Sequence, residues 1–286
     1  MSFRAAYEEV LGRWPGPVEG VESATPYGVT RINSCGPADA PPVVLLPGGG
    51  ATSTVWGACA AGLVDGHRVH AVDLVGEPGL SVPAPGRSIR GVGDLVGWLD
   101  AVLDGLAPDG PGRRGGPGGR GGPGGPVTLV GHSYGAWIAA HYAAARPDRL
   151  GRLVLVDPTQ VFTGLRPAYV LRALPVLLRP TPRRIRSFLA WETGGAVLDE
   201  DWLRLQDEVA GFPVVRPVTG PRPDPAGFGG LPVRVLFAER ARCHDAARAA
   251  RAARAALPGA RVDVLPGVSH HALPLTAPRE VALALA

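Results

Sequence analysis

The sequence contains no lysine and only three cysteines, and none of its apolar runs is long enough to cross a membrane. All 29 basic residues are arginine, and with 25 acidic residues they leave a net charge of +4 over 286 residues. Nucleic-acid binding needs basic residues gathered on one face or groove, and this weak excess does not indicate it. We attribute the lack of lysine to genome composition.

The cysteines, Cys35, Cys59 and Cys243, are widely spaced and include no Cys-x-x-Cys pair. This pattern predicts neither a disulfide framework nor a zinc site, and it favours a reducing compartment. Charged residues interrupt the N-terminal stretch, so it lacks the apolar segment of a signal peptide. The most apolar segments, such as 42–46 and 153–156, are much shorter than the about 20 residues of a membrane span. We expect a cytoplasmic protein with no membrane partner.

Glycine and proline are abundant, with 41 and 31 residues, but 45% of the chain is hydrophobic, which excludes disorder throughout. Part of the excess lies in residues 110–126, which are Gly, Pro or Arg without exception. Such a segment has no side chains for a packed core, so it predicts a flexible surface loop. The alternative is an interaction module built on its two RGGPGG repeats.

Short apolar segments alternate with helical patterns along most of the chain. Residues 95–106 place apolar side chains at the spacing of an amphipathic helix. The apolar segments have the length of buried strands and lie at 43–46, 68–73, 127–130, 153–157, 233–237 and 261–265. Strands separated by helices predict an α/β fold, with a mostly parallel sheet and helices on both of its faces.

Two regions depart from this alternation. Residues 18–34 alternate between polar and apolar and predict an antiparallel hairpin. Between residues 161 and 228 the strand pattern stops and proline-rich amphipathic segments replace it. We therefore expect a core of residues 1–160 and 229–286 and an inserted helical cap of residues 161–228. Three arginines of this cap either bind an acidic substrate or are solvated: Arg183, Arg184 and Arg186.

The segment Gly131-His132-Ser133-Tyr134-Gly135 lies between a predicted strand and an alanine-rich helical segment. A sharp strand-to-helix turn strains the residue at its tip, and small residues two positions before and after it let neighbouring backbone pass. Such a turn exposes the Ser133 hydroxyl and places the Tyr134 amide at the helix N-terminus, where it can stabilise an oxyanion. This context is typical of a nucleophilic serine. We expect His132 to point away from that hydroxyl and to be a pocket or packing residue.

A second glycine-rich motif, Pro47-Gly48-Gly49-Gly50, follows the first predicted core strand. A loop without side chains leaves its amides open, and we choose Gly49 as the second oxyanion donor. A phosphate-binding loop would need a following Gly-Lys-Ser/Thr or the Gly-x-Gly-x-x-Gly spacing, and neither is present. An ordinary tight turn is the alternative.

These two motifs, the run VDLVGEPGLS at 72–81 and the late segment HALPL match, in order, the motifs of the α/β-hydrolases. The chain resembles the capped, esterase-like branch of that superfamily over nearly its whole length, apart from residues 110–126. Pro47 stands where a histidine is often found. The resemblance implies a serine nucleophile, an acid and a histidine base in that chain order. Ser133 disfavours epoxide and haloalkane hydrolysis, because those relatives carry Asp at this position.

The resemblance places the base after the last strand, where His270 and His271 are adjacent. We favour His271, because it begins the segment HALPL and stands seven residues before Pro278, the spacing that similar proteins show. His270 is the alternative.

The acid of similar proteins usually follows the penultimate strand, but Ala241 occupies the expected position. Asp245 is the nearest replacement and our first choice, although it also suits the N-cap of the helix that follows. Asp157, directly after a predicted strand, and Glu239 are the alternatives. The acid would orient the imidazole and stabilise its charged form.

These residues predict a serine hydrolase that cleaves a small carboxylic ester or related acyl compound through an acyl-enzyme. We expect no cofactor and no metal, because the consecutive Cys243, His244 and Asp245 point in different directions and rarely bind one ion. The missing carboxylate at position 241 suggests the alternative of a non-hydrolytic ligand-binding or lyase-like protein with this fold. Aromatic residues of the predicted cap would line an apolar pocket: Phe162, Tyr169, Trp191, Trp202 and Phe212.

Overall fold

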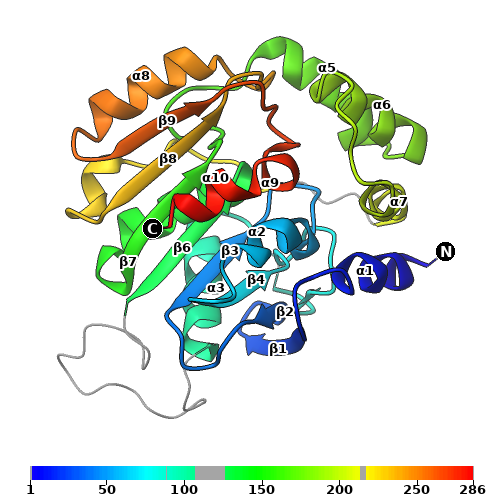
Figure 1. Cartoon of the computed structure of the whole chain (residues 1–286), viewed down its shortest axis with the longest axis horizontal. Helices are drawn as coiled ribbons and strands as arrows, with labels where there is room; N and C mark the ends of the chain where they lie inside the picture. Colours follow the sequence, from blue (N-terminus) through cyan, green and yellow to red (C-terminus); the bar gives the residue numbers. More distant parts are fainter. Residues whose placement is uncertain (1, 88, 107–125, 213–216, 286) are drawn as a thin grey trace.

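The computed structural model describes residues 2–87, 89–106, 126–212 and 217–285. These residues form one nine-stranded sheet of order β1-β2-β4-β3-β6-β7-β8-β9, with β5 paired to β2 (Figure 1). The strands are β1 Glu19–Thr25, β2 Gly28–Cys35, β3 Pro42–Leu46, β4 Arg68–Val72, β5 Val82–Pro83, β6 Val127–His132, β7 Leu150–Val156, β8 Val233–Ala238 and β9 Arg261–Leu265. Apart from Pro126, the predicted flexible loop at 110–126 lies outside the described residues.

The sheet is parallel from β4 through β3 and β6 to β9 and antiparallel at the β1–β2 end. The predicted mostly parallel sheet is therefore confirmed, and the predicted hairpin over 18–34 is the β1–β2 pair. The central strands are nearly continuous apolar runs, because helices cover both of their faces. Val43 to Leu46 of β3 are completely buried.

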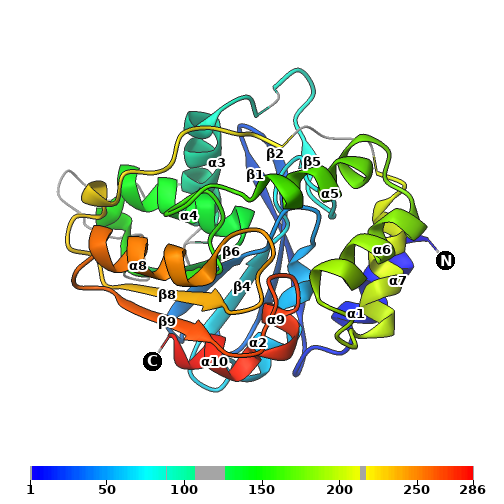
Figure 2. The same ribbon diagram turned by 90° about the horizontal axis from the view of Figure 1, so that it is seen from above.

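Helices cover the two faces of the sheet as predicted (Figure 2). One face packs against α3 (Val92–Gly105), α4 (Tyr134–Ala145) and α8 (Ala246–Ala256). The other face packs against α2 (Gly57–Ala61), α9 (Leu273–Thr276) and α10 (Pro278–Leu283). Short 3₁₀ turns lie at Ser53–Trp56, Pro147–Arg149 and Pro225–Phe228. No described helix is both long enough and apolar enough to span a membrane.

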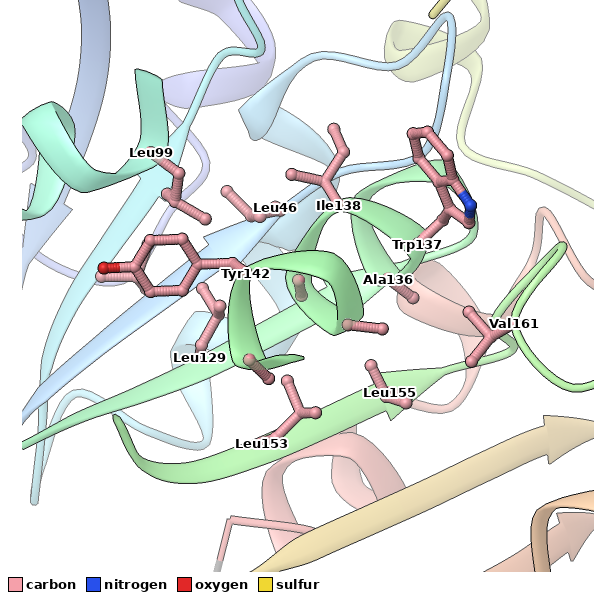
Figure 3. Packing of buried hydrophobic residues seen from close by; sticks show 14 of the residues in the cluster. Leu46, Leu99, Leu129, Ala136, Trp137, Ile138, Tyr142, Leu153, Leu155 and Val161 are labelled. Atoms are coloured by element: carbon pink, nitrogen blue, oxygen red, sulfur yellow. The ribbon is translucent and has the colours of Figure 1, made fainter. Parts of the chain in front are cut away.

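Helix α4 sits at the centre of the larger core cluster, directly over β6 and β7 (Figure 3). Its alanines let the helix approach the sheet closely, and Ile138 and Tyr142 belong to the same buried cluster as Leu129 and Leu153 of the two strands. The Tyr142 hydroxyl donates a hydrogen bond of 2.7 Å to Asp100 on α3. This packing fixes the first turn of α4 relative to the end of β6.

Three helices between β7 and β8 stand apart from the sheet: α5 (Pro167–Leu178), α6 (Pro182–Glu192) and α7 (Glu200–Val209) (Figure 1). We call these three helices the insert. They fall inside the predicted cap of residues 161–228. The division into this cap and a core of residues 1–160 and 229–286 stays a prediction.

An N-terminal helix, α1 (Phe3–Leu11), joins the insert to the sheet, and the sequence patterns did not predict it. Tyr7 and Val10 pack against Leu205 of α7, and the Tyr7 hydroxyl donates a hydrogen bond of 3.0 Å to the buried Asp73. Asp73 follows β4 and also accepts the Ser53 amide at 2.7 Å. The first helix of the chain therefore anchors α7.

Replacing Leu129 by Ala should destabilise the protein by about 2–5 kcal/mol, because it opens a cavity between β6 and α4. Leu129 is completely buried, whereas Leu283 of α10 is 65% exposed. The control Leu283→Ala should change the free energy of unfolding by no more than about 0.5 kcal/mol. Urea denaturation measures both values, and equal losses would contradict this description of the core.

Candidate active site

Ser133 occupies the tip of the turn between β6 and α4, with φ 54° and ψ −112°. A residue with a side chain rarely adopts this backbone conformation, so the surrounding packing must hold it. A Cβ atom on Gly131 would collide with the Gly135 backbone, and one on Gly135 would collide with the Leu46 and Pro47 carbonyls. The glycines two residues before and after Ser133 are therefore required by close backbone contacts.

His270, rather than His271, contacts Ser133. The Nε2 atom of His270 lies 2.8 Å from Ser133 Oγ, and its Nδ1 atom lies 2.6 Å from Asp157 Oδ2. The ring is buried, with 1% of the side chain exposed. This geometry corrects the choice of His271 as the partner of Ser133.

His271 faces a different carboxylate. Its Nδ1 atom lies 3.2 Å from Oε2 of Glu192 on α6, which is an ion-pair distance, and its backbone N–H donates to the same oxygen at 3.0 Å. Burial alone would raise the pKa of Glu192, but the contacts from His271 outweigh it and lower the pKa to about 2. Glu192 therefore holds His271 against the insert, at the wall of the pocket.

Asp157 directly follows β7 and is completely buried. Its carboxylate accepts hydrogen bonds from His270, from His244 Nε2 at 3.0 Å and from the Ala238 amide at 3.0 Å. Burial alone would raise the pKa of Asp157, but the hydrogen bonds from the two histidines outweigh it and hold the pKa below its ordinary value. The carboxylate therefore stays charged inside the protein.

The two other candidate acids lie elsewhere, which corrects the choice of Asp245. Asp245 is the N-cap of α8, accepting the Arg248 amide at 2.9 Å, and its exposed carboxylate pairs with Arg166 at 3.3 Å. Glu239 is exposed and accepts the Gly267 amide at 2.8 Å.

The sequence patterns do not indicate His244 as a site residue, although it lies three residues beyond the expected acid position at Ala241. It is buried, and its only sequence signal was its place in the segment that follows β8.

The loop after β3 lies beside the Ser133 turn, as predicted. A Cβ atom on Gly49 would be 3.6 Å from Cβ of Tyr134, so the two backbones are close neighbours. The Gly50 amide donates a hydrogen bond of 2.9 Å to Glu77, which ties this loop to the segment after β4. Tyr134 is the first residue of α4, where backbone N–H groups have no partner within the helix. Gly49 and Tyr134 also line the same pocket as Ser133.

An apolar pocket of about 400 Å³ opens above Ser133, between the sheet and the insert. Three of the five aromatic residues predicted to line it do so: Tyr169, Trp202 and Phe212. The other two pack elsewhere. Phe162 lies in the core beside Phe237, with ring centroids 6.3 Å apart, and Trp191 lies under the Arg242 guanidinium at 4.8 Å.

The only three groups in the described residues close enough to share a metal ion are Asp157, Cys243 and His270, whose donor atoms lie within 4.8 Å of one another. Their other contacts do not suit an ion. Both oxygens of Asp157 accept hydrogen bonds from histidines, and both nitrogens of His270 are engaged by Asp157 and Ser133. Burial raises the pKa of the Cys243 thiol, which disfavours the thiolate that a metal needs. These contacts therefore disfavour a metal ion at this set.

His132 lies under the site as a packing residue. It is buried, and its Nε2 atom lies 3.0 Å from the His270 carbonyl, to which the ring donates if Nε2 carries the proton. Its ring faces that of His270 at a centroid distance of 4.9 Å. The expectation that it is a pocket or packing residue agrees with this position.

A model of the alpha/beta hydrolase family matches residues 43–285 of the chain. The chain therefore belongs to the α/β-hydrolase family, and the resemblance seen in its motifs is confirmed.

Among curated proteins, the chain is similar to carboxylesterase YbfK of Bacillus subtilis, with 25% identity over 94% of this chain and 88% of that protein. It is also 25% identical to the uncharacterized carboxylesterase nap of the same organism, over 66% of this chain and 56% of that protein. The crystal structure of carboxylesterase CesB (YbfK) from B. subtilis superposes with a TM-score of 0.84 at 23% identity, covering 99% of this chain and 95% of that one. This superposition shows the shared fold.

The protein should lose stability as the pH falls from about 6.5 toward 4.5. Burial lowers the pKa of His132 to about 3 and that of His70 to about 4, from 6.5 in the unfolded chain. Because the unfolded chain binds these protons first, acid favours unfolding over this range. The free energy of unfolding, measured in urea at several pH values, should fall less steeply for His70→Gln. A slope equal to that of the wild type would contradict the assignment.

Proposed function

We propose that the chain is a serine hydrolase that cleaves small carboxylic esters through an acyl-enzyme. The observation that carries this proposal is the unbroken hydrogen-bonded series from Asp157 through His270 to Ser133 at the base of an apolar pocket. The similarity to two proteins named as carboxylesterases supports the choice of an ester.

In the first step, His270 Nε2 accepts the proton of Ser133 as its oxygen attacks the ester carbonyl. Asp157 accepts the hydrogen bond from Nδ1, which fixes the imidazole tautomer and stabilises its charged form. The backbone amides of Gly49 and Tyr134 donate to the oxyanion of the tetrahedral intermediate. His270 then gives its proton to the departing alcohol, and the acyl group stays on Ser133.

In the second step, water attacks the acyl-enzyme. His270 accepts a proton from the water, and the resulting tetrahedral intermediate breaks down to release the carboxylic acid and restore the Ser133 hydroxyl. Each half-reaction uses the same base and the same two amides, so no cofactor is needed.

The insert would act as the cap over the substrate. Its pocket wall is mainly aliphatic and aromatic, which suits an apolar acyl or alcohol group of the ester. The three buried cysteines are free thiols, which supports a reducing, cytoplasmic environment for the enzyme.

The alternative of a non-hydrolytic protein rested on the alanine at position 241. Asp157 supplies a carboxylate to the imidazole from a neighbouring strand end, so that alanine leaves no gap in the site. The hydrolase is therefore the better supported function.

A fluorophosphonate probe should label the wild-type protein and should not label Ser133→Ala or His270→Gln. His271→Gln should still react, because Ser133 keeps its contact with His270 and Glu192 keeps the hydrogen bond from the backbone of residue 271. Mass spectrometry of the intact protein measures the labelled fraction. Labelling of Ser133→Ala equal to that of the wild type would contradict the proposal.

Asp157→Asn should lower kcat/KM for a p-nitrophenyl ester by about 10⁴-fold, because the amide can no longer hold the imidazole in the required tautomer. The matched control is Asp245→Asn, because asparagine caps a helix as well as aspartate does. It should stay within about twofold of the wild type. A larger loss in Asp245→Asn than in Asp157→Asn would contradict the assignment of the acid.

A further inference from the structure

Helix α5 carries an apolar surface that no described part of the chain covers. No residue of α5 is buried, and five of its apolar side chains follow the i, i+1, i+4, i+7, i+8 spacing of one helix face. These side chains form what we call the α5 stripe: Val170 (38% exposed), Leu171 (67%), Leu174 (37%), Leu177 (50%) and Leu178 (69%). A contiguous apolar patch of this kind marks an interaction surface more often than an isolated exposed leucine does.

The α5 stripe meets the rim of the pocket above Ser133. Tyr169, Ala173 and Val176 lie on the adjacent face of the same helix and line that pocket. Leu177 belongs to both surfaces, since it lines the pocket and is half exposed. An apolar molecule held at the stripe would therefore be next to the entrance of the site.

Basic residues without acidic partners lie on the same helical hairpin, α5–α6, as the stripe. Residues 161–191 contain six arginines and no acidic residue. Two of the arginines are neutralised, Arg186 by Asp207 and Glu200 at 2.8 Å each, and Arg166 by Asp245 at 3.3 Å. The other four are exposed and form no ion pair with a described residue: Arg172, Arg179, Arg183 and Arg184.

Three of these four arginines lie at the turn between α5 and α6: Arg179 follows the last residue of α5, and Arg183 and Arg184 are in the first turn of α6. The Arg184 guanidinium donates to the Arg179 carbonyl at the end of α5, at 2.8 Å, and Arg172 donates to Ser187 of α6 at 2.9 Å. Arg172 therefore faces α6, on the side of α5 away from the stripe. The other three arginines lie next to the C-terminal end of the stripe. An apolar face bordered by arginines is the pattern of a helix that lies in the interface of an anionic membrane.

We propose that the α5 stripe and the three arginines at its C-terminal end, Arg179, Arg183 and Arg184, dock the protein on an anionic lipid surface, where apolar esters enter the pocket beside Leu177. This surface contact differs from a membrane span, and it is an alternative to our expectation of no membrane partner. A second copy of the chain is disfavoured as the occupant, because a two-fold contact would bring like charges together. The docking of the protein on lipid does not depend on the proposed function. The entry of esters into the pocket does rest on the proposed ester hydrolysis.

Vesicle flotation of the full chain tests the proposal. The protein should bind vesicles of phosphatidylglycerol and phosphatidylcholine in equal parts, and bind much less to pure phosphatidylcholine. Leu171→Ser with Leu178→Ser should weaken binding at least about 10-fold, because both leucines leave water on docking. Arg179→Gln with Arg183→Gln should weaken it about 30-fold, since each arginine near an anionic surface contributes about 1 kcal/mol. None of these four residues lines the pocket.

The matched control is Arg248→Gln with Arg251→Gln, which removes the same charge from the exposed face of α8. This variant should bind the anionic vesicles as the wild type does. Three results would overturn the proposal: no binding by the wild type, equal weakening by the α8 control, or full binding by the leucine variant. A dimer in sedimentation velocity that the leucine variant converts to a monomer would also overturn it, by identifying a second copy as the occupant.

The same variants separate docking from catalysis. Ser133→Ala should bind the vesicles as tightly as the wild type does. The leucine variant should hydrolyse a short soluble ester within about twofold of the wild-type rate, but it should be slower on a long-chain ester held in the anionic vesicles. If the wild type binds the vesicles but hydrolyses neither ester, the proposed function fails and the docking proposal stands. If both esters are cleaved without vesicle binding, only the docking proposal fails.

Discussion

The hydrogen bond between Asp157 and His270 is the contact on which the rest of the site depends. It is 2.6 Å long, and both side chains are almost completely shielded from water. A charged carboxylate is costly to bury, and its three hydrogen bonds offset that cost. The parallel strands β6, β7 and β8 end side by side, so Ser133, Asp157 and the Ala238 amide meet at one edge of the sheet. The strand ends therefore bring the carboxylate and the serine hydroxyl to the two nitrogens of the His270 ring.

Local patterns in the sequence predicted the parts of the structure that depend on neighbouring residues. The central strands are apolar runs of strand length, and the glycines around Ser133 are required by the turn itself, so both could be predicted from short segments. The glycine-rich loop after β3 could be placed for the same reason. Helix α1 was not predicted, because its stability depends on Asp73 and α7, which are distant in sequence.

The histidine and the acid could not be chosen correctly from local patterns. His270 and His271 are adjacent in the sequence, but they have different partners in the structure. His270 contacts Asp157 and Ser133, whereas His271 contacts Glu192, which is 79 residues away on α6. Asp245 was chosen because it follows the penultimate strand, but its side chain caps α8. Asp157 lies on the neighbouring strand end, closer to Ser133 in the sheet. Contacts between segments that are distant in the sequence therefore decide which of several suitable residues form the site.

The most direct measurement of the central claim is a double-mutant cycle on His270 and Asp157, with kcat/KM for a soluble ester as the readout. If the carboxylate acts only through the imidazole, removing it from a protein that already lacks the imidazole has no further effect. His270→Ala combined with Asp157→Asn should therefore be as slow as His270→Ala alone, within about threefold. Losses that multiply in the double variant would contradict the account, because they would mean that the two residues act independently.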